Sequence, residues 1–190
     1  MIHAAGPHEN WDAVTLFTTG LSDIIVKLPN GRPVATELSL SLPLDWPLDE
    51  KSLQNPDRNW PIRWIERIVC ATRDSRTWPD RHEAVFMYGD PPQPLAEGTH
   101  LCGWLCLESQ RGNYQMPDYR YIEIRGMFPI YAAEQKLIAE AGGQTLVRRF
   151  QAHGIPQYIT PDRPNMADEQ FAEDDDEMDD EDDFDMGCEL

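Results

Sequence analysis

A zinc site is the first chemistry that the residue types of this 190-residue sequence suggest, because His100, Cys102 and Cys106 lie close together. Imidazole and thiolate groups are usual zinc ligands, and they must converge within about 2.3 Å of the metal. The three residues instead fall in one predicted strand, 99–108, where they share a face over about 20 Å. We therefore expect no metal site, and we interpret them as two buried thiols and a histidine at the strand edge.

A cysteine nucleophile is the second possibility, with Cys70 or Cys102 as the thiol and His82 or His153 as the base. No local sequence around these residues is of a kind that activates a thiolate. The motifs G-x-S-x-G, G-x-G-x-x-G, H-E-x-x-H and the P-loop are all missing from the sequence. We therefore predict that the protein is not an enzyme and uses no cofactor; an unrecognised hydrolase remains the catalytic alternative.

The formal charge of −18 is concentrated at one end of the chain. Residues 168–190 hold 14 of the 34 acidic residues and no Lys or Arg, so the rest carries 20 acids against 16 bases. A nearly neutral body with an acidic segment has no electrostatic attraction to phosphate, so we expect no nucleic-acid ligand. From residue 167 the composition cannot bury enough apolar surface to fold alone, which predicts an acidic disordered tail over 167–190.

The length fits one domain of ordinary size, which we expect in the cytoplasm, and the 41% apolar content is somewhat below the typical globular share but allows a core to form. No apolar stretch approaches the roughly 18 residues of a membrane helix, and no basic segment leads into an apolar one near residue 1. Cys102 and Cys106 would lie about 13 Å apart on a strand, too far for a disulfide. We therefore expect reduced thiols and no membrane partner.

The elements that must position these residues follow from hydrophobic periodicity. Strands are predicted at 11–18, 36–42, 83–88, 99–108 and 119–125, and helices from Pro61 to about 77, over 130–141 and over 146–154. This order predicts an α/β fold of the α+β type, a mixed and largely antiparallel sheet with helices packed on it. Residues 1–10 are expected to be a flexible N-terminus, 46–59 a polar loop, and 11–166 the folded domain.

The strand at 36–42 has the clearest alternation. Leu38, Leu40 and Leu42 alternate with Glu37, Ser39 and Ser41. One face should therefore be buried and the other solvated.

Three tryptophans precede prolines, at Trp46, Trp60 and Trp78. Our first interpretation is that each one fixes a loop on the core. The alternative is a rigid aromatic surface for a protein partner, since Trp and Arg dominate binding hot spots.

An ordered series of short motifs resembles the bacterial form of the Suppressor of fused domain and covers about residues 14–153. No single motif is specific, but their order is. The motifs are Leu21-Ser22-Asp23, Glu37-Leu38, Leu44-Asp45-Trp46-Pro47-Leu48, Trp60-Pro61, Thr77-Trp78, His82, Gly89-Asp90-Pro91-Pro92-Gln93-Pro94-Leu95, Gly98-Thr99, Gly103, Phe128-Pro129-Ile130-Tyr131, Glu134 and Gly142.

This resemblance implies a domain without known catalytic activity that works by binding other proteins. Animal members clamp a short peptide of a zinc-finger transcription factor, and many bacterial members are proposed immunity proteins that neutralise toxins. The animal clamp uses an acidic residue just after the segment matching Thr77-Trp78, where this chain has Arg81-His82. The resemblance therefore does not extend to that clamp.

We predict a cytosolic protein-binding domain, most plausibly the immunity partner of a toxin, with a cytosolic adaptor or chaperone-like scaffold as the alternative. The oligomeric state is left open. The predicted partner-binding residues are Trp78, Arg81 and His82, because the matching segment of the animal members contacts the partner and because Trp with Arg is typical of hot spots.

Overall fold

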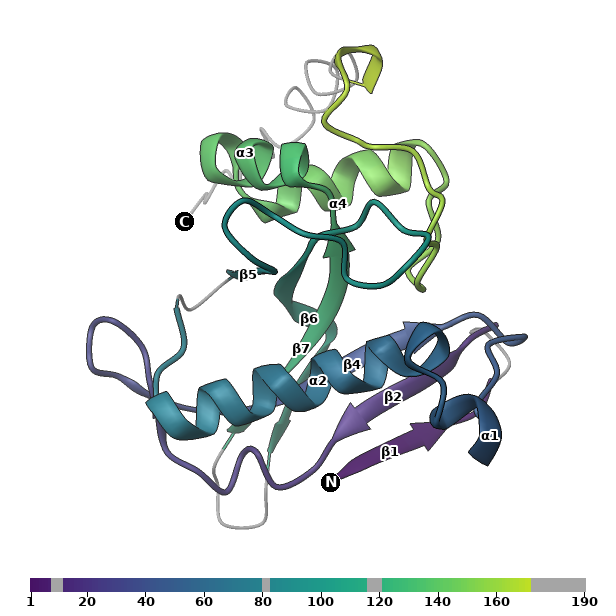
Figure 1. Ribbon diagram of the computed structural model, residues 1–190. Helices are drawn as coiled ribbons and strands as arrows, with labels where there is room; N and C mark the ends of the chain where they lie inside the picture. The colour runs from purple at the N-terminus through teal and green to yellow at the C-terminus, as the bar shows by residue number, and fades with distance from the viewer. Residues whose placement is uncertain (8–11, 80–82, 116–120, 172–190) are drawn as a thin grey trace, which may run out of the picture.

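The fold is built on one mixed sheet, described in a computed structural model that covers residues 1–7, 12–79, 83–115 and 121–171, with the backbone alone for 109–114. The described strands are β1 (Ile2–Ala5), β2 (Val14–Thr18), β3 (Val26–Lys27), β4 (Pro33–Leu42), β5 (Glu83–Met87), β6 (Gly103–Gln115) and β7 (Tyr121–Ile130). Their order is β1-β2-β4-β7-β6-β5 (Figure 1). Strand β3 lies beside this path and pairs with β4. Only the β4–β7 pair is parallel among the described pairs, which confirms the predicted mixed, largely antiparallel sheet.

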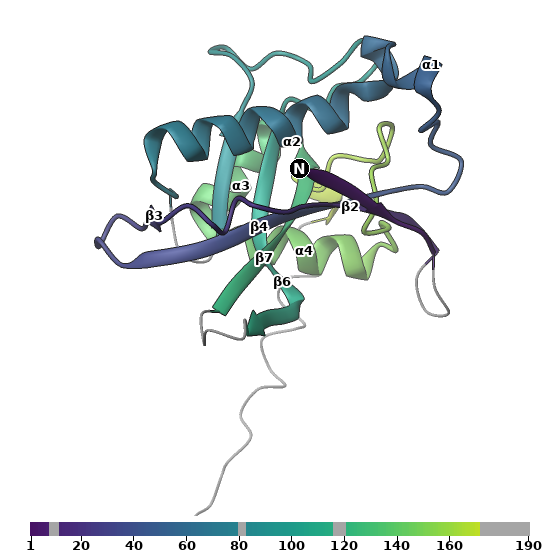
Figure 2. The same ribbon diagram turned by 90° about the horizontal axis from the view of Figure 1, so that it is seen from below.

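Helices cover both faces of this sheet. They are α1 (Glu50–Leu53), α2 (Pro56–Ser75), α3 (Ala132–Ala141) and α4 (Gly143–Ala152), with a 3₁₀ turn, η1, at Glu169–Phe171. Side chains alternate along β6, so Trp104 and Cys106 join the core under α2, whereas Leu105 and Leu107 join the core formed with α3 and α4. Figure 2 shows α2 on one side of the sheet and α4 on the other. No helix of the described part is long and apolar enough to span a membrane.

Helix α2 begins earlier than the sequence predicted. The expected first residue was Pro61, but the helix starts at Pro56, and the side chain of Asn55 accepts the backbone N–H of Asp57. Asn followed by Pro supplies both an N-cap and a preferred first residue, so it outcompetes the later proline. Helix α1 also lies within the segment 46–59, which was expected to be a loop.

Both ends of the described chain differ from expectation. Residues 1–10 were expected to be flexible, but Ile2–Ala5 forms strand β1, paired antiparallel with β2. At the other end the tail was expected from 167, but η1 follows directly and the ring of Phe171 packs 4.7 Å from that of His153. Residues 172–190 lie outside the described residues, so their predicted disorder stays a prediction.

The polar face of β4 is less solvated than predicted at Glu37. This carboxylate is only 8% exposed and accepts hydrogen bonds from Thr18 Oγ1 at 2.5 Å, Ser22 Oγ at 2.7 Å and Ser22 N at 2.9 Å. The backbone N–H of Gly20 donates to it as well, at 2.9 Å. Glu37 therefore fastens the turn after β2 to the sheet.

Candidate functional site

Trp78 lies in the core and fixes its loop there. Its side chain is 0% exposed, its ring meets that of Phe86 edge-on at 5.6 Å, and the guanidinium carbon of Arg125 lies 4.9 Å from the ring centroid. The backbone N–H of Trp78 donates to Lys27 O at 2.9 Å, which joins the loop to β3. The burial of Trp78 agrees with our first interpretation, in which it fixes a loop on the core, and not with an exposed aromatic surface.

Of the three predicted partner-binding residues, the structure therefore describes Trp78 alone. A partner would meet the loop around Trp78 rather than its buried indole. Arg81 and His82 lie outside the described residues. A partner-binding role for the three residues stays a prediction.

The other two tryptophans are also packed. Trp60 lies inside α2 rather than in a loop and is 5% exposed. Trp46 is half-buried, donates Nε1–H to Arg58 O at 3.1 Å, and lies 6.0 Å from the Trp60 ring. Trp60 in turn lies 5.7 Å from Trp104, so the aromatic side chains build the core under α2.

A hollow of about 410 Å³ opens beside Trp78 where α2, β3 and β5 meet. We call it the Trp78 hollow. It is lined by Lys27, Leu28, Pro29, Ala71, Thr72, Ser75, Thr77, Trp78, Pro79 and Phe86. These residues combine apolar walls with one cation and three hydroxyl groups, and the described lining includes no carboxylate. Such a surface suits a peptide that places apolar side chains in the hollow and whose other side chains are acidic or neutral.

Strand β5 forms one wall of this hollow through Phe86 and is also an edge of the sheet. Among the described strands it pairs with β6 alone. An unpaired edge presents backbone N–H and C=O groups to which an extended peptide can add as a further strand. A peptide added there would place alternate side chains next to the hollow.

The rim of the hollow is basic and aromatic. Lys27, Arg67 and Arg76 are exposed, and Arg67 lies one helical turn before Ala71 of the lining. The Arg67 guanidinium carbon lies 4.8 Å from the Trp64 ring centroid and 5.4 Å from that of Tyr88, which is 36% exposed. Cations stacked on aromatic rings are frequent in binding hot spots.

These rim residues were not among those predicted from the sequence. The spacing of Trp64 and Arg67 places them on one side of α2, which is a detectable signal. Nothing in the sequence brings Lys27 or Tyr88 to the same place, because that depends on the strand order.

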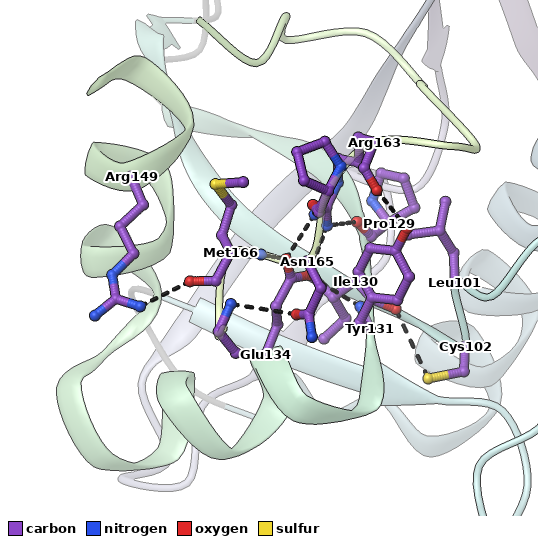
Figure 3. Close-up of polar contacts among 12 residues, drawn as sticks. Leu101, Cys102, Pro129, Ile130, Tyr131, Glu134, Arg149, Arg163, Asn165 and Met166 are labelled. Atoms are coloured by element: carbon purple, nitrogen blue, oxygen red, sulfur yellow. Dashed lines mark hydrogen bonds and ion pairs between the residues drawn. The ribbon is translucent and has the colours of Figure 1, made fainter. Parts of the chain in front are cut away.

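A second polar cluster joins Glu134 of α3 to Arg163 of the C-terminal segment (Figure 3), and both of these side chains are buried. Glu134 and Arg163 form two N–O contacts of 2.5 Å each. Glu134 also accepts the backbone N–H of Tyr131 and of Met166, both at 2.9 Å, and Arg163 Nη2 donates to Pro129 O at 2.8 Å. With its charges paired and its described hydrogen bonds made, this cluster holds the C-terminal segment on the domain rather than offering reactive groups.

The buried thiols are poor nucleophiles. Burial, and next the charge of Glu134, raise the pKa of Cys102, whose Sγ–H donates to Ile130 O at 3.8 Å. Burial raises the pKa of Cys106 to about 12. Both thiols therefore stay protonated at neutral pH. Within the described residues no group of three or more His, Cys, Asp or Glu side chains is arranged to hold a metal ion.

Fold and site together define a class of protein: an α+β domain with an open sheet edge beside an apolar, basic-rimmed hollow. The family model described as Suppressor of fused protein (SUFU) matches residues 1–164, and the chain belongs to that family. The resemblance inferred from the ordered motifs is thereby confirmed.

Solved structures agree on the fold. Drosophila Suppressor of Fused aligns with a TM-score of 0.62 at 13% identity, over 90% of this chain and 43% of that one, so this chain spans less than half of that protein. The chain from the Sufu–Fu complex structure aligns with a TM-score of 0.63 at 12% identity, over 90% of this chain and 78% of that one. A putative SUFU homologue from Neisseria gonorrhoeae FA 1090 aligns with a TM-score of 0.50 at 13% identity, over 86% of this chain and 77% of that one. No curated protein matches the sequence.

Proposed function

We propose that this chain is a non-catalytic protein-binding domain that holds an extended segment of its partner along β5, with side chains in the Trp78 hollow. The observation that carries the proposal is the edge of β5, which no described strand covers and which borders an apolar hollow. The similar chain in the Sufu–Fu complex comes from a complex between proteins, which supports a binding role.

The proposal includes a chemical preference of the site. Lys27, Arg67 and Arg76 favour acidic residues on the partner, and Leu28, Ala71 and Phe86 favour apolar ones between them. Electrostatic attraction of this kind raises the association rate and selects the partner, while the apolar contacts supply most of the affinity.

A toxin domain as the partner, with the chain as a cytoplasmic bacterial immunity protein, is the finer form of the proposal and rests on the resemblance to bacterial family members. A toxin-like reading frame directly upstream of the gene would support it. An adaptor or chaperone-like scaffold is the alternative, and would be favoured by capture of a partner with no toxin domain.

Charge-reversal variants of the full-length protein test the site once a partner has been captured. Arg67→Glu and Lys27→Glu should each weaken binding about tenfold or more. The matched control is Lys136→Glu, an exposed lysine on α3 on the other side of the sheet. Equal binding by all three variants, with unchanged thermal midpoints, would place the interface elsewhere.

A further inference from the structure

Helix α2 borders a second hollow, on a different side from the Trp78 hollow. About 680 Å³ of space lies between this helix, the start of β1 and the turn after β2. Its apolar walls include Ile2, Leu21 and Ile24. The helix contributes a row of residues at helical spacing, which we call the α2 stripe: Ile62, Glu66, Val69, Cys70 and Arg73.

The α2 stripe faces away from the sheet. Helix α2 lies in front of the sheet in Figure 1, and its sheet-facing side is buried. In contrast, Glu66, Cys70 and Arg73 are exposed, and Ile62 and Val69 are half-buried. The stripe therefore presents apolar side chains together with one acid and one base to whatever packs against this side of the helix.

The two charged residues of the stripe have little to hold them within the domain. Among the described residues Glu66 has no ion-pair partner within 4.0 Å. Arg73 lies 3.5 Å from the neighbouring Asp74, with both side chains more than half exposed. A surface pair of this kind contributes little stability. Glu66 and Arg73, seven residues and about 10.5 Å apart along the axis, suit a partner surface with the same charges in reverse order.

We propose that the α2 stripe is an interface between two copies of this chain, packed antiparallel about a two-fold axis at Val69 and Cys70. Glu66 and Arg73 are equidistant from the midpoint between Val69 and Cys70, so this axis brings Glu66 of each copy to Arg73 of the other. Val69 of each copy meets Cys70 of the other at the centre. One ion pair is thereby formed twice, and the apolar residues between the two pairs are covered.

The charge of α2 favours this choice of surface. The whole chain carries −18, whereas α2 has four arginines against three acidic residues, a balance of +1. Repulsion between two copies is therefore weaker at this helix than at the acidic residues 168–190. The antiparallel arrangement also sets the two helix dipoles in opposite directions, which is favourable.

The proposed dimer leaves the Trp78 hollow open and does not depend on the binding site proposed above. Ala71 and Ser75 line that hollow and project from another side of α2 than the stripe. A dimer would therefore carry two Trp78 hollows and two β5 edges. A partner with two matching segments would bind it more tightly than it binds a single copy.

Sedimentation equilibrium of the full-length protein, from about 10 µM to 1 mM, tests the self-association, since a contact of one helix face belongs to the weak class. Glu66→Arg and Arg73→Glu should each weaken it at least about tenfold, because each variant places like charges opposite one another twice. The double variant Glu66→Arg/Arg73→Glu should restore it to within about threefold. The matched control is Glu140→Arg, the same charge change at an exposed residue of α3.

Chemical linking tests the position of the axis without altering α2. A short bismaleimide should join Cys70 of two copies in the Cys188→Ser protein, and the product should be missing from Cys70→Ser/Cys188→Ser. Cys102 and Cys106 are buried and should not react. Adding Glu66→Arg should lower the yield of linked dimer at least about fivefold.

Four results would overturn the proposal. A monomer mass at every concentration excludes the dimer. Self-association that both reversal variants leave unchanged lies on another surface, and the same holds if Cys70 is never linked. Loss in both single variants without recovery in the double variant means that Glu66 and Arg73 do not face one another. An equal loss in Glu140→Arg assigns the effect to net charge. Circular dichroism establishes that each variant is folded, and if a reversal variant is not, the linking of Cys70 decides.

Discussion

Arg163 and Glu134 form a two-point ion pair in the interior, with side chains 4% and 0% exposed and both N–O distances at 2.5 Å. The pair joins the first turn of α3 to the C-terminal segment that follows α4. The guanidinium carbon of Arg163 also lies 4.6 Å from the ring centroid of Phe150 on α4. One side chain thus ties the last described residues to two helices and to the end of β7.

The first prediction is that Arg163→Met lowers the free energy of unfolding by about 3–5 kcal/mol, because it leaves the charge of Glu134 buried without its cation. Urea denaturation of the full-length protein measures this change. Lys136→Met on the surface of α3 is the control and should change stability by less than about 0.5 kcal/mol. Adding Glu134→Leu to Arg163→Met should recover part of the loss, and a loss below about 1 kcal/mol in the single variant would contradict the assignment.

The second prediction concerns Trp78, which packs between Phe86 and Arg125 with no exposed surface. Trp78→Ala should cost about 3–5 kcal/mol of stability, because it leaves a cavity in the core under α2. Trp78→Phe keeps an aromatic ring and should cost less. Denaturant titration with near-ultraviolet circular dichroism measures both, and an unchanged stability in Trp78→Ala would contradict the packing role.

A third prediction follows from the four hydrogen bonds that Glu37 accepts at the turn after β2. Glu37→Gln replaces one acceptor oxygen by a donor NH₂ group, so at least one of these donors loses its partner. Stability should fall by about 1–3 kcal/mol. The exposed Glu97→Gln is the matched control, and equal melting temperatures for the two variants would exclude the anchoring role.

The sequence predicts well what depends on local spacing. The alternation of Leu38, Leu40 and Leu42 correctly identifies the buried face of β4. Some of the motifs that carry the family resemblance supply hydrogen bonds that stabilise the fold. Ser22 and Glu37 come from separate motifs and bond to one another, and the backbone of Tyr131 donates to Glu134.

The candidate site was not predictable in the same way. Strand β1 escaped detection because four residues are too few to show a period, and its pairing partner β2 lies beyond residue 12. The open strand edge beside the Trp78 hollow exists because β5 is at an edge of the sheet. That position is a property of the strand order and not of any single segment. Lys27 and Ala71 come to line the same hollow only after α2 and β3 have packed.

The last prediction concerns thiol reactivity, which separates exposed from buried cysteines. Cys70 is exposed on α2, whereas Cys102 and Cys106 are buried with raised pKa values. With a pKa of about 12, the thiolate fraction of Cys106 at pH 8 is only about one in ten thousand. Alkylation of the native protein at pH 8 should therefore modify Cys70 within minutes and leave Cys106 unmodified, as read by peptide mass spectrometry. After denaturation without a reductant all four cysteines should react, since we expect no disulfide, and Cys70→Ser identifies the fast site. Rapid modification of native Cys106 would mean that the core under α2 opens readily, and two unreactive thiols in the denatured chain would reveal a disulfide.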